Sequence, residues 1–96
     1  MLFAVCFTDD PARAGERPRL MAAHLAFLEA NRTAVRAAGP LLDGAAGAGG
    51  LWLVEAPDAA TVRRLVEADP FWPSGLRQAV RILVWRQVFA DGRRLA

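Results

Sequence analysis

The chain has 96 residues, of which 54% are hydrophobic and 23% are charged, and its net charge is only +2. This length suits one small domain with a limited interior, so the high apolar content predicts that another subunit covers part of the surface. Basic and acidic residues are interspersed along the chain without a basic run, which argues against nucleic acid as a partner.

The N-terminal segment and the single cysteine indicate the compartment. The start, MLFAVCFTDD, lacks the positive region of a signal peptide and reaches two acids within ten residues. No stretch approaches the roughly 20 apolar residues of a membrane span. A lone cysteine, Cys6, excludes an internal disulfide and is typical of a reducing compartment. We therefore expect a cytoplasmic protein without a membrane partner.

Residues 2–8 form the first predicted strand, because a β-rich apolar run is followed by the turn sequence Asp9-Asp10-Pro11. An Ala- and Leu-rich segment with helical periodicity follows at about 18–38, and Gly39-Pro40 is expected to end it. The inward stripe of this helix is predicted to contain Leu20, His24, Phe27, Leu28, Asn31 and Val35.

The second half of the chain predicts a hairpin, a helix and a long strand. Leu41-Leu42 and residues 51–56 are expected to pair around the flexible loop DGAAGAGG at 43–50. A helix is expected over 59–68, with Asp58 as its N-cap and Pro70 after its end. A loop is then predicted over 71–78, a strand over 79–90 and a frayed tail over 91–96.

The predicted order is βαββαβ, within one domain over residues 1–96. Two helices on one face of a four-stranded antiparallel sheet form the ferredoxin-like α+β arrangement. That arrangement leaves the other sheet face bare, although the strands at 2–8 and 79–90 are apolar on both faces. We therefore expect a homodimer that stacks the two sheets or closes them into an α/β barrel.

His24 is the only histidine, and it lies near the centre of the stripe that faces the sheet. A buried imidazole without a hydrogen-bond partner costs about 1–3 kcal/mol. Asp69 continues the inward stripe of the second helix, at a C-terminus where the helix dipole disfavours a carboxylate by about 0.3–1 kcal/mol. Because both helices lie on one sheet face, these two side chains could meet.

The pair has two interpretations. In a His–Asp dyad the carboxylate fixes the imidazole tautomer, and the other ring nitrogen exchanges protons with a substrate. Alternatively, His24 is a core residue bonded to a backbone carbonyl, and Asp69 caps the Asp-Pro turn. Phe71, Trp72 and Ser74 follow in the next loop and are candidates for the wall of a small-ligand pocket. No metal and no cofactor are expected, because one histidine and one cysteine on different elements do not form a zinc site.

Five segments in chain order resemble the YCII-related (YciI-like) family over nearly the whole chain: MLFAVCFTDDP, HLAFLEA, AGPLLD, LVEAPDAATVRRLVEADPF and VRILVWRQVF. The resemblance implies a homodimer similar to the dimeric α/β-barrel proteins, and an active-site His/Asp pair at His24 and Asp69. Elimination of chloride from a chlorinated hydroxyhydroquinone by one relative implies proton transfer on small ring compounds. Two positions depart from the family pattern, since Met21 stands where an arginine is common and Val84 replaces a proline.

We therefore expect a small cofactor-free enzyme of the isomerase, lyase or dehalogenase type. His24, oriented by Asp69, would move a proton on a small molecule, with aromatic compounds among the options. Two alternatives remain open at this stage. The same pocket could bind a ligand without chemistry, or the chain could be a dimerisation module in which the pair is only a buried polar contact.

Overall fold

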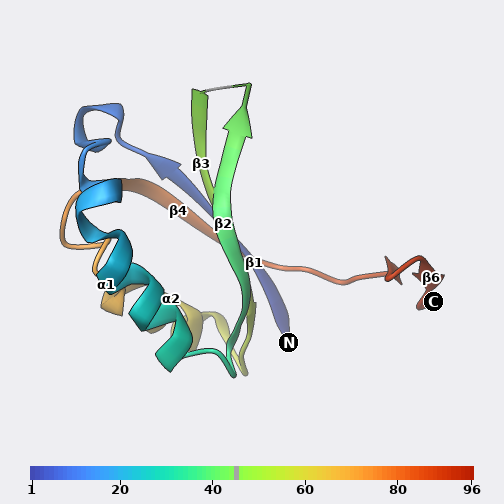
Figure 1. Ribbon diagram of the computed structural model, residues 1–96. Coiled ribbons are helices and arrows are strands. Elements are labelled where there is room, and N and C mark those ends of the chain that lie inside the picture. The colour runs from blue at the N-terminus through green and yellow to red at the C-terminus, as the bar shows by residue number, and fades with distance from the viewer. Residues whose placement is uncertain (45) are drawn as a thin grey trace.

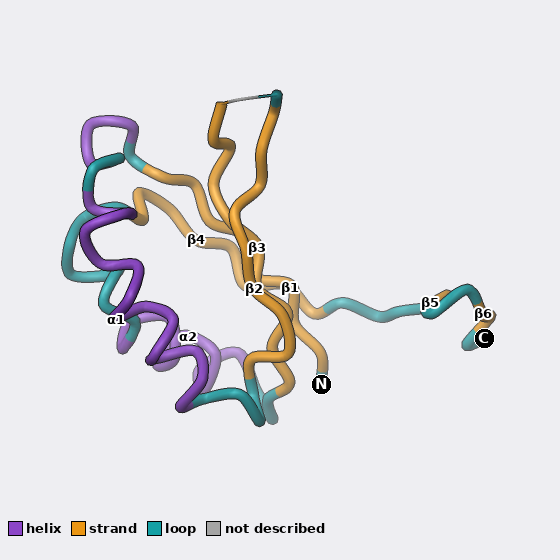
Figure 2. Tube along the Cα trace, in the orientation of Figure 1, coloured by secondary structure: helices purple, strands orange, loops and turns teal. Residues whose placement is uncertain are grey.

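The computed structural model describes residues 1–44 and 46–96, and its two layers are visible in Figures 1 and 2. Helices α1 and α2 cover one face of a sheet with strand order β2-β3-β1-β4, in which every neighbouring pair is antiparallel. The predicted ferredoxin-like α+β fold is therefore confirmed. None of the described helices is long and apolar enough to cross a membrane. The elements are β1 (Leu2–Asp9), the 3-10 helix η1 (Pro11–Arg13), α1 (Glu16–Ala30), β2 (Val35–Asp43), β3 (Ala46–Glu55), α2 (Ala59–Ala68), β4 (Arg77–Val84), β5 (Phe89–Ala90) and β6 (Arg93–Arg94).

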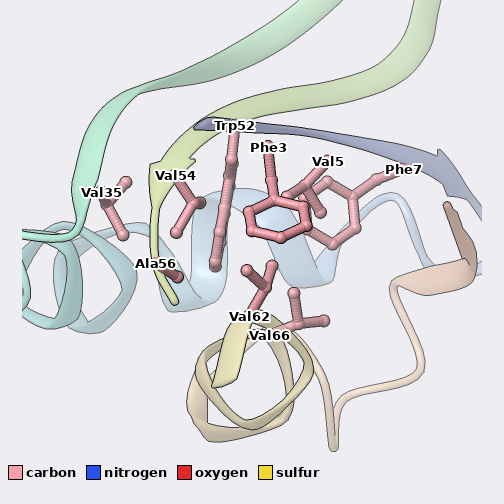
Figure 3. Packing of buried hydrophobic residues seen from close by; sticks show 9 residues of the cluster. All are labelled: Phe3, Val5, Phe7, Val35, Trp52, Val54, Ala56, Val62 and Val66. Atoms are coloured by element: carbon pink, nitrogen blue, oxygen red, sulfur yellow. The ribbon is translucent and has the colours of Figure 1, made fainter. Parts of the chain in front are cut away.

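The core lies between the sheet and the two helices (Figure 3). Alternate side chains of β1 point into it, and Val5 lies opposite Trp52 of β3 in the strand register. Val62 and Val66 of α2 close the core from the other side, as the predicted inward stripe requires. Each such side chain contributes about 1.5–3 kcal/mol when it leaves water. This packing fixes the helix layer above the sheet.

Helix α1 is shorter than its periodicity predicts, and the expectation of a helix to residue 38 is wrong. The helix ends at Ala30, and Asn31 caps it by donating its side-chain amide to the carbonyl of Phe27 at 2.8 Å. Val35, predicted on the helical stripe, is instead the buried first residue of β2. Pairing with β3 along the sheet outweighs the helical propensity of the alanines here.

The predicted hairpin is present, but its strands are longer than expected. Most of the glycine-rich segment belongs to β3, Gly44 lies in the turn, and Ala45 lies outside the described residues. Gly49 has φ 108°, and a Cβ there would lie 1.9 Å from the carbonyl oxygen of Phe7. These glycines therefore allow β1 to approach β3 closely.

The C-terminal region also differs from the prediction of one strand over 79–90. Strand β4 starts at Arg77 and ends at Val84, because β1 offers no further residues beyond Leu2 to pair with it. A separate hairpin, β5–β6, follows and lies away from the body in Figure 1. Asp91 and Gly92 both have positive φ, as a type I′ turn requires, so part of the predicted frayed tail is paired.

Helix α2 begins and ends as predicted. The side chain of Asp58 accepts a hydrogen bond from the Thr61 amide at 2.8 Å. This bond, with a second from the Thr61 hydroxyl, lowers the pKa of Asp58 below its usual value. At the other end, Asp69 is the C-cap, in the extended conformation that precedes Pro70.

Candidate functional site

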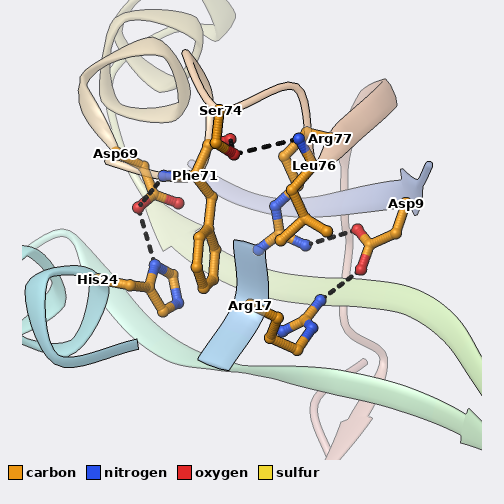
Figure 4. A network of polar contacts seen from close by, with 8 residues as sticks. All are labelled: Asp9, Arg17, His24, Asp69, Phe71, Ser74, Leu76 and Arg77. Carbon is orange, nitrogen blue, oxygen red and sulfur yellow. Dashed lines mark hydrogen bonds and ion pairs between the residues drawn. The ribbon is translucent and has the colours of Figure 1, made fainter. Parts of the chain in front are cut away.

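The two predicted residues meet between the helices. His24 Nδ1 and Asp69 Oδ1 are 2.8 Å apart, and both side chains are buried, with residue exposures of 6% and 2% (Figure 4). His24 is the only buried residue of α1. The same Asp69 oxygen accepts the Phe71 amide at 3.3 Å, so Asp69 caps the turn and contacts the histidine at once. The two interpretations of Asp69 are therefore compatible.

This contact determines which nitrogen of His24 is available. An ionised carboxylate only accepts hydrogen bonds, so Nδ1 carries the proton in the neutral ring. Nε2 is then an unprotonated base, and within the described residues it has no hydrogen-bond partner. The contact with Asp69 therefore fixes the orientation of the ring and leaves Nε2 as the nitrogen that can accept a proton from a ligand.

Aromatic residues hold the plane of the imidazole. The Phe71 ring is fully buried and stacks on His24, with centroids 4.1 Å apart and planes inclined by 22°. The Trp52 ring lies 6.2 Å from the imidazole. These rings leave His24 little freedom to leave Asp69, and the ring orientation is preorganised.

Of the three predicted pocket residues, Phe71 stacks on His24. The Trp72 ring lies beneath the guanidinium of Arg63, whose Cζ is 4.9 Å from the ring centroid. The Ser74 hydroxyl donates to the Phe71 carbonyl at 2.6 Å and accepts the Leu76 amide at 3.1 Å. Phe71, Trp72 and Ser74 are all absent from the described lining of the cavity beside His24. The contacts of Trp72 and Ser74 hold the loop after α2 in place, and the cavity lies between α1 and the sheet.

A cavity of about 100 Å³ opens beside His24, lined by side chains from α1 and from three strands of the sheet. The sequence does not predict that β2 lines this cavity, because the expected helix extends to about residue 38. Met21, at the position where the family pattern has arginine, lies on this wall, and Arg17 one turn earlier supplies a cation. The lining consists of Arg17, Met21, His24, Leu25 and Leu28 of α1, Ala38, Gly39 and Pro40 of β2, Trp52 of β3 and Arg77 of β4.

A charged cluster forms one side of this cavity. Arg77 Nη1 donates to Asp9 Oδ1 at 3.0 Å, and Arg17 binds the other oxygen of the same carboxylate (Figure 4). The Arg77 guanidinium also lies over the rings of Phe7 and Phe71, at 4.1 and 5.1 Å from their centroids. Burial lowers the pKa of Arg77, and Asp9 opposes that change, so the guanidinium remains charged.

Arg77 reaches the site because of a β-bulge. Thr8 pairs with Ala79 but Asp9 pairs with Arg77, so β4 has one extra residue at Gln78. In a regular strand Arg77 would share a face with Arg81, which is exposed. The bulge turns Arg77 to the helix side instead. Simple alternation along the strand therefore could not identify this residue.

The described residues contain no group of three His, Cys, Asp or Glu side chains that could hold a metal ion. The site consists of one imidazole, two carboxylates and two guanidinium groups. Such a set can bind anions and transfer protons.

Comparisons with known proteins relate this site to one family. A model of the YCII-related domain matches residues 1–86. Among solved structures, 5-chloro-2-hydroxyhydroquinone dehydrochlorinase from Burkholderia phenoliruptrix AC1100, in complex with 2,5-dihydroxybenzoquinone, is 32% identical with a TM-score of 0.80. The match covers 90% of this chain and 94% of that chain. No curated protein is significantly similar. On the match over residues 1–86, the chain belongs to the YCII-related family.

Proposed function

We propose that this protein is a cofactor-free enzyme that transfers a proton on a small, ring-containing molecule through His24 and Asp69. The buried 2.8 Å contact between these side chains is the observation that carries the proposal. The cavity beside His24 gives a ligand access to the ring. The similarity to a dehydrochlorinase that acts on a chlorinated hydroxyhydroquinone supports an elimination as the reaction class.

In this mechanism Nε2 of His24 removes a proton from the bound ring compound. Asp69 stabilises the imidazolium that forms and keeps the ring oriented. In an elimination from a chlorinated hydroquinone, one hydroxyl group becomes a ketone as its proton moves to the ring carbon that bears chlorine. Nε2 then takes the proton of a second ring hydroxyl, the O–H electron pair forms the new C=O bond, the ring double bonds shift, and chloride departs with its bonding pair. In an isomerisation, the imidazolium returns the same proton to another atom of the ligand.

The first test uses 5-chloro-2-hydroxyhydroquinone, the substrate named for the similar enzyme, as the probe. Chloride release and deuterium incorporation from D₂O are measured for the wild type, His24→Gln and Asp69→Asn. Loss of the general base lowers the rate by about 10²–10⁴-fold in His24→Gln. Asp69→Asn also lowers the rate, because an amide at this position no longer stabilises the imidazolium.

Glu29→Gln is the matched control, because Glu29 lies on the exposed side of α1. Its rate should equal that of the wild type, and circular dichroism should show the same fold for all variants. A wild type that neither releases chloride nor exchanges deuterium would overturn the proposal. So would a His24→Gln variant as active as the wild type.

We further propose that the protein is a homodimer joined through the sheet face that lacks helices. This face has an apolar hollow lined by Ala4, Leu51, Leu53, Leu83, Val84 and Trp85. Leu83 and Trp85 are 40% and 43% exposed in the single chain. Exposed apolar patches of this kind mark protein interfaces. Sedimentation at micromolar concentration should give the mass of two chains, and a monomer would contradict the proposal.

A further inference from the structure

Arg77 has hydrogen-bond donors that the protein does not use. Its side chain is only 3% exposed, and its hydrogen bonds within the described residues go to Asp9 alone. Nε is fully buried and has no partner. A buried donor without a partner costs about 1–3 kcal/mol, so a native structure seldom leaves one idle.

The free donors lie on one edge of the guanidinium. Nη1 is directed to Asp9, and the Nε–H and Nη2–H groups of an arginine point the same way, as a fork for two oxygen atoms. The rings of Phe7 and Phe71 hold the group in place. A Cβ at Gly50 would lie 3.1 Å from Nη1, so the backbone of β3 also passes close to the guanidinium. The guanidinium of Arg77, which lines the cavity, is therefore held rigidly, with its Nε buried.

The charge of the cluster is not balanced. Both oxygens of Asp9 are engaged, one by Arg77 and the other by Arg17. The cluster of Arg17, Arg77 and Asp9 thus carries one net positive charge on a wall of the cavity, and the Asp69 carboxylate beside His24 is the negative charge that acts on it from the other side of the site. Figure 4 shows Phe71 between His24 and Arg77, so an aromatic surface joins the base to the cation.

We infer that Arg77, whose side chain lines the cavity, binds an anionic oxygen of the ligand through its guanidinium group. The ligand class is a small ring that carries a carboxylate or an ionised enol or phenol oxygen. This inference rests on the proposed function, since it assumes that the ligand lies beside His24. When Nε2 removes a proton from the ring, negative charge spreads to such an oxygen, and the adjacent guanidinium stabilises it.

The test measures equilibrium binding by calorimetry in the His24→Gln background, where no chemistry occurs and no imidazolium attracts the anion. The probes are 2,5-dihydroxybenzoquinone, whose vinylogous acid groups are ionised at neutral pH, and hydroquinone, which is neutral. Arg77→Met should weaken binding of the anion by about tenfold or more, because a charge-assisted fork is lost. Its affinity for hydroquinone should change by less than about threefold.

Arg32→Met is the matched control, since Arg32 is exposed in the turn after α1, and it should leave both affinities unchanged. Arg77→Lys keeps the charge without the fork and should give an intermediate loss. If circular dichroism shows that Arg77→Met does not fold, the inference is tested by two other measurements. These are the anion affinity of Arg77→Lys and the ratio of the parent protein's affinities for 2,5-dihydroxybenzoquinone and hydroquinone. Equal affinity of the parent for both probes, or full anion affinity in Arg77→Lys and Arg77→Met, would overturn the inference.

The two proposals fail differently. A preference for the anion that depends on Arg77, combined with no turnover in the wild type, would leave the anion site standing and remove the enzyme. Turnover that depends on His24, with no preference for the anion, would support the enzyme and remove the anion site.

Discussion

The two faces of the sheet are built from the same strands but differ in what they carry. On the helix side, Phe3, Val5 and Trp52 are at most 1% exposed, and the paired His24 and Asp69 are buried on the same side. On the other side, Leu83 and Trp85 remain about two-fifths exposed and form an apolar hollow. One face is closed and contains the polar chemistry, whereas the other is open and largely apolar.

The difference follows from the cost of burial. A polar group within a closed layer must be paired, and on the helix side His24, Asp69 and Asp9 have partners. The exception is Nε of Arg77, which has no partner within the described residues. On the open face the described hollow is lined by apolar residues, while the charged Arg36 and Glu55 lie in a separate depression next to Leu53, so the hollow is suited to contact with another apolar surface.

The largest expected effect is a difference in the free energy of unfolding between alanine substitutions at two adjacent residues of β3 that lie on opposite faces of the sheet. Trp52→Ala removes a buried indole and should lower the free energy of unfolding by about 3–5 kcal/mol. Leu53→Ala, one residue further along β3, should cost about 1 kcal/mol or less in the isolated chain, because Leu53 is only partly buried. Urea denaturation at low protein concentration measures both values. Equal losses would mean that the two faces do not differ as described.

A charge on the open face should separate the proposed dimer without unfolding the chain. Leu53→Arg places an unpaired cation in the apolar hollow and should raise the dimer dissociation constant by about 100-fold. Ala26→Arg on the exposed side of α1 is the control and should leave assembly unchanged. Sedimentation gives the two constants, and a Leu53→Arg dimer as tight as the wild type would place the interface elsewhere.

The smallest expected effect is the pH dependence of the stability that Asp58, the N-cap of α2, contributes. The hydrogen bonds from Thr61 lower the pKa of Asp58 in the folded chain, so its stabilising effect is complete above the unfolded pKa. As the pH falls through the folded pKa, this contribution is lost. Asp58→Asn retains a capping acceptor that does not titrate. Its melting temperature should therefore fall less than that of the wild type in acid, and parallel curves would contradict the prediction.

Much of the fold could be predicted because its determinants are local and periodic. The alternation in β1, the stripe of α2 and the cap at Asp58 all indicate their elements directly. The contact between His24 and Asp69 followed from two inward positions on helices that share a sheet face. The role of the pair remains a prediction, since geometry alone does not establish catalysis.

The missed features depend on tertiary pairing. Residues 35–43 have a helical composition at their start, and only the partner strand β3 makes them a strand. The placement of Arg77 depends on a single extra residue opposite Thr8 and Asp9, which no pattern in one strand reveals. The Asp-Gly turn at residues 91–92 was a recognisable hairpin sequence that had been interpreted as a loose tail.

The bulge at Gln78 changes the sheet face to which the odd-numbered side chains of β4 point. Before it, the side chain of Arg77 lies on the sheet face that the helices cover, and after it Arg81 and Leu83 lie on the face without helices. Odd-numbered positions of one short strand thus lie on opposite faces of the sheet. Under the two proposals made above, ligand preference and assembly can therefore change independently, although Arg77 and Leu83 are only about 20 Å apart along one strand.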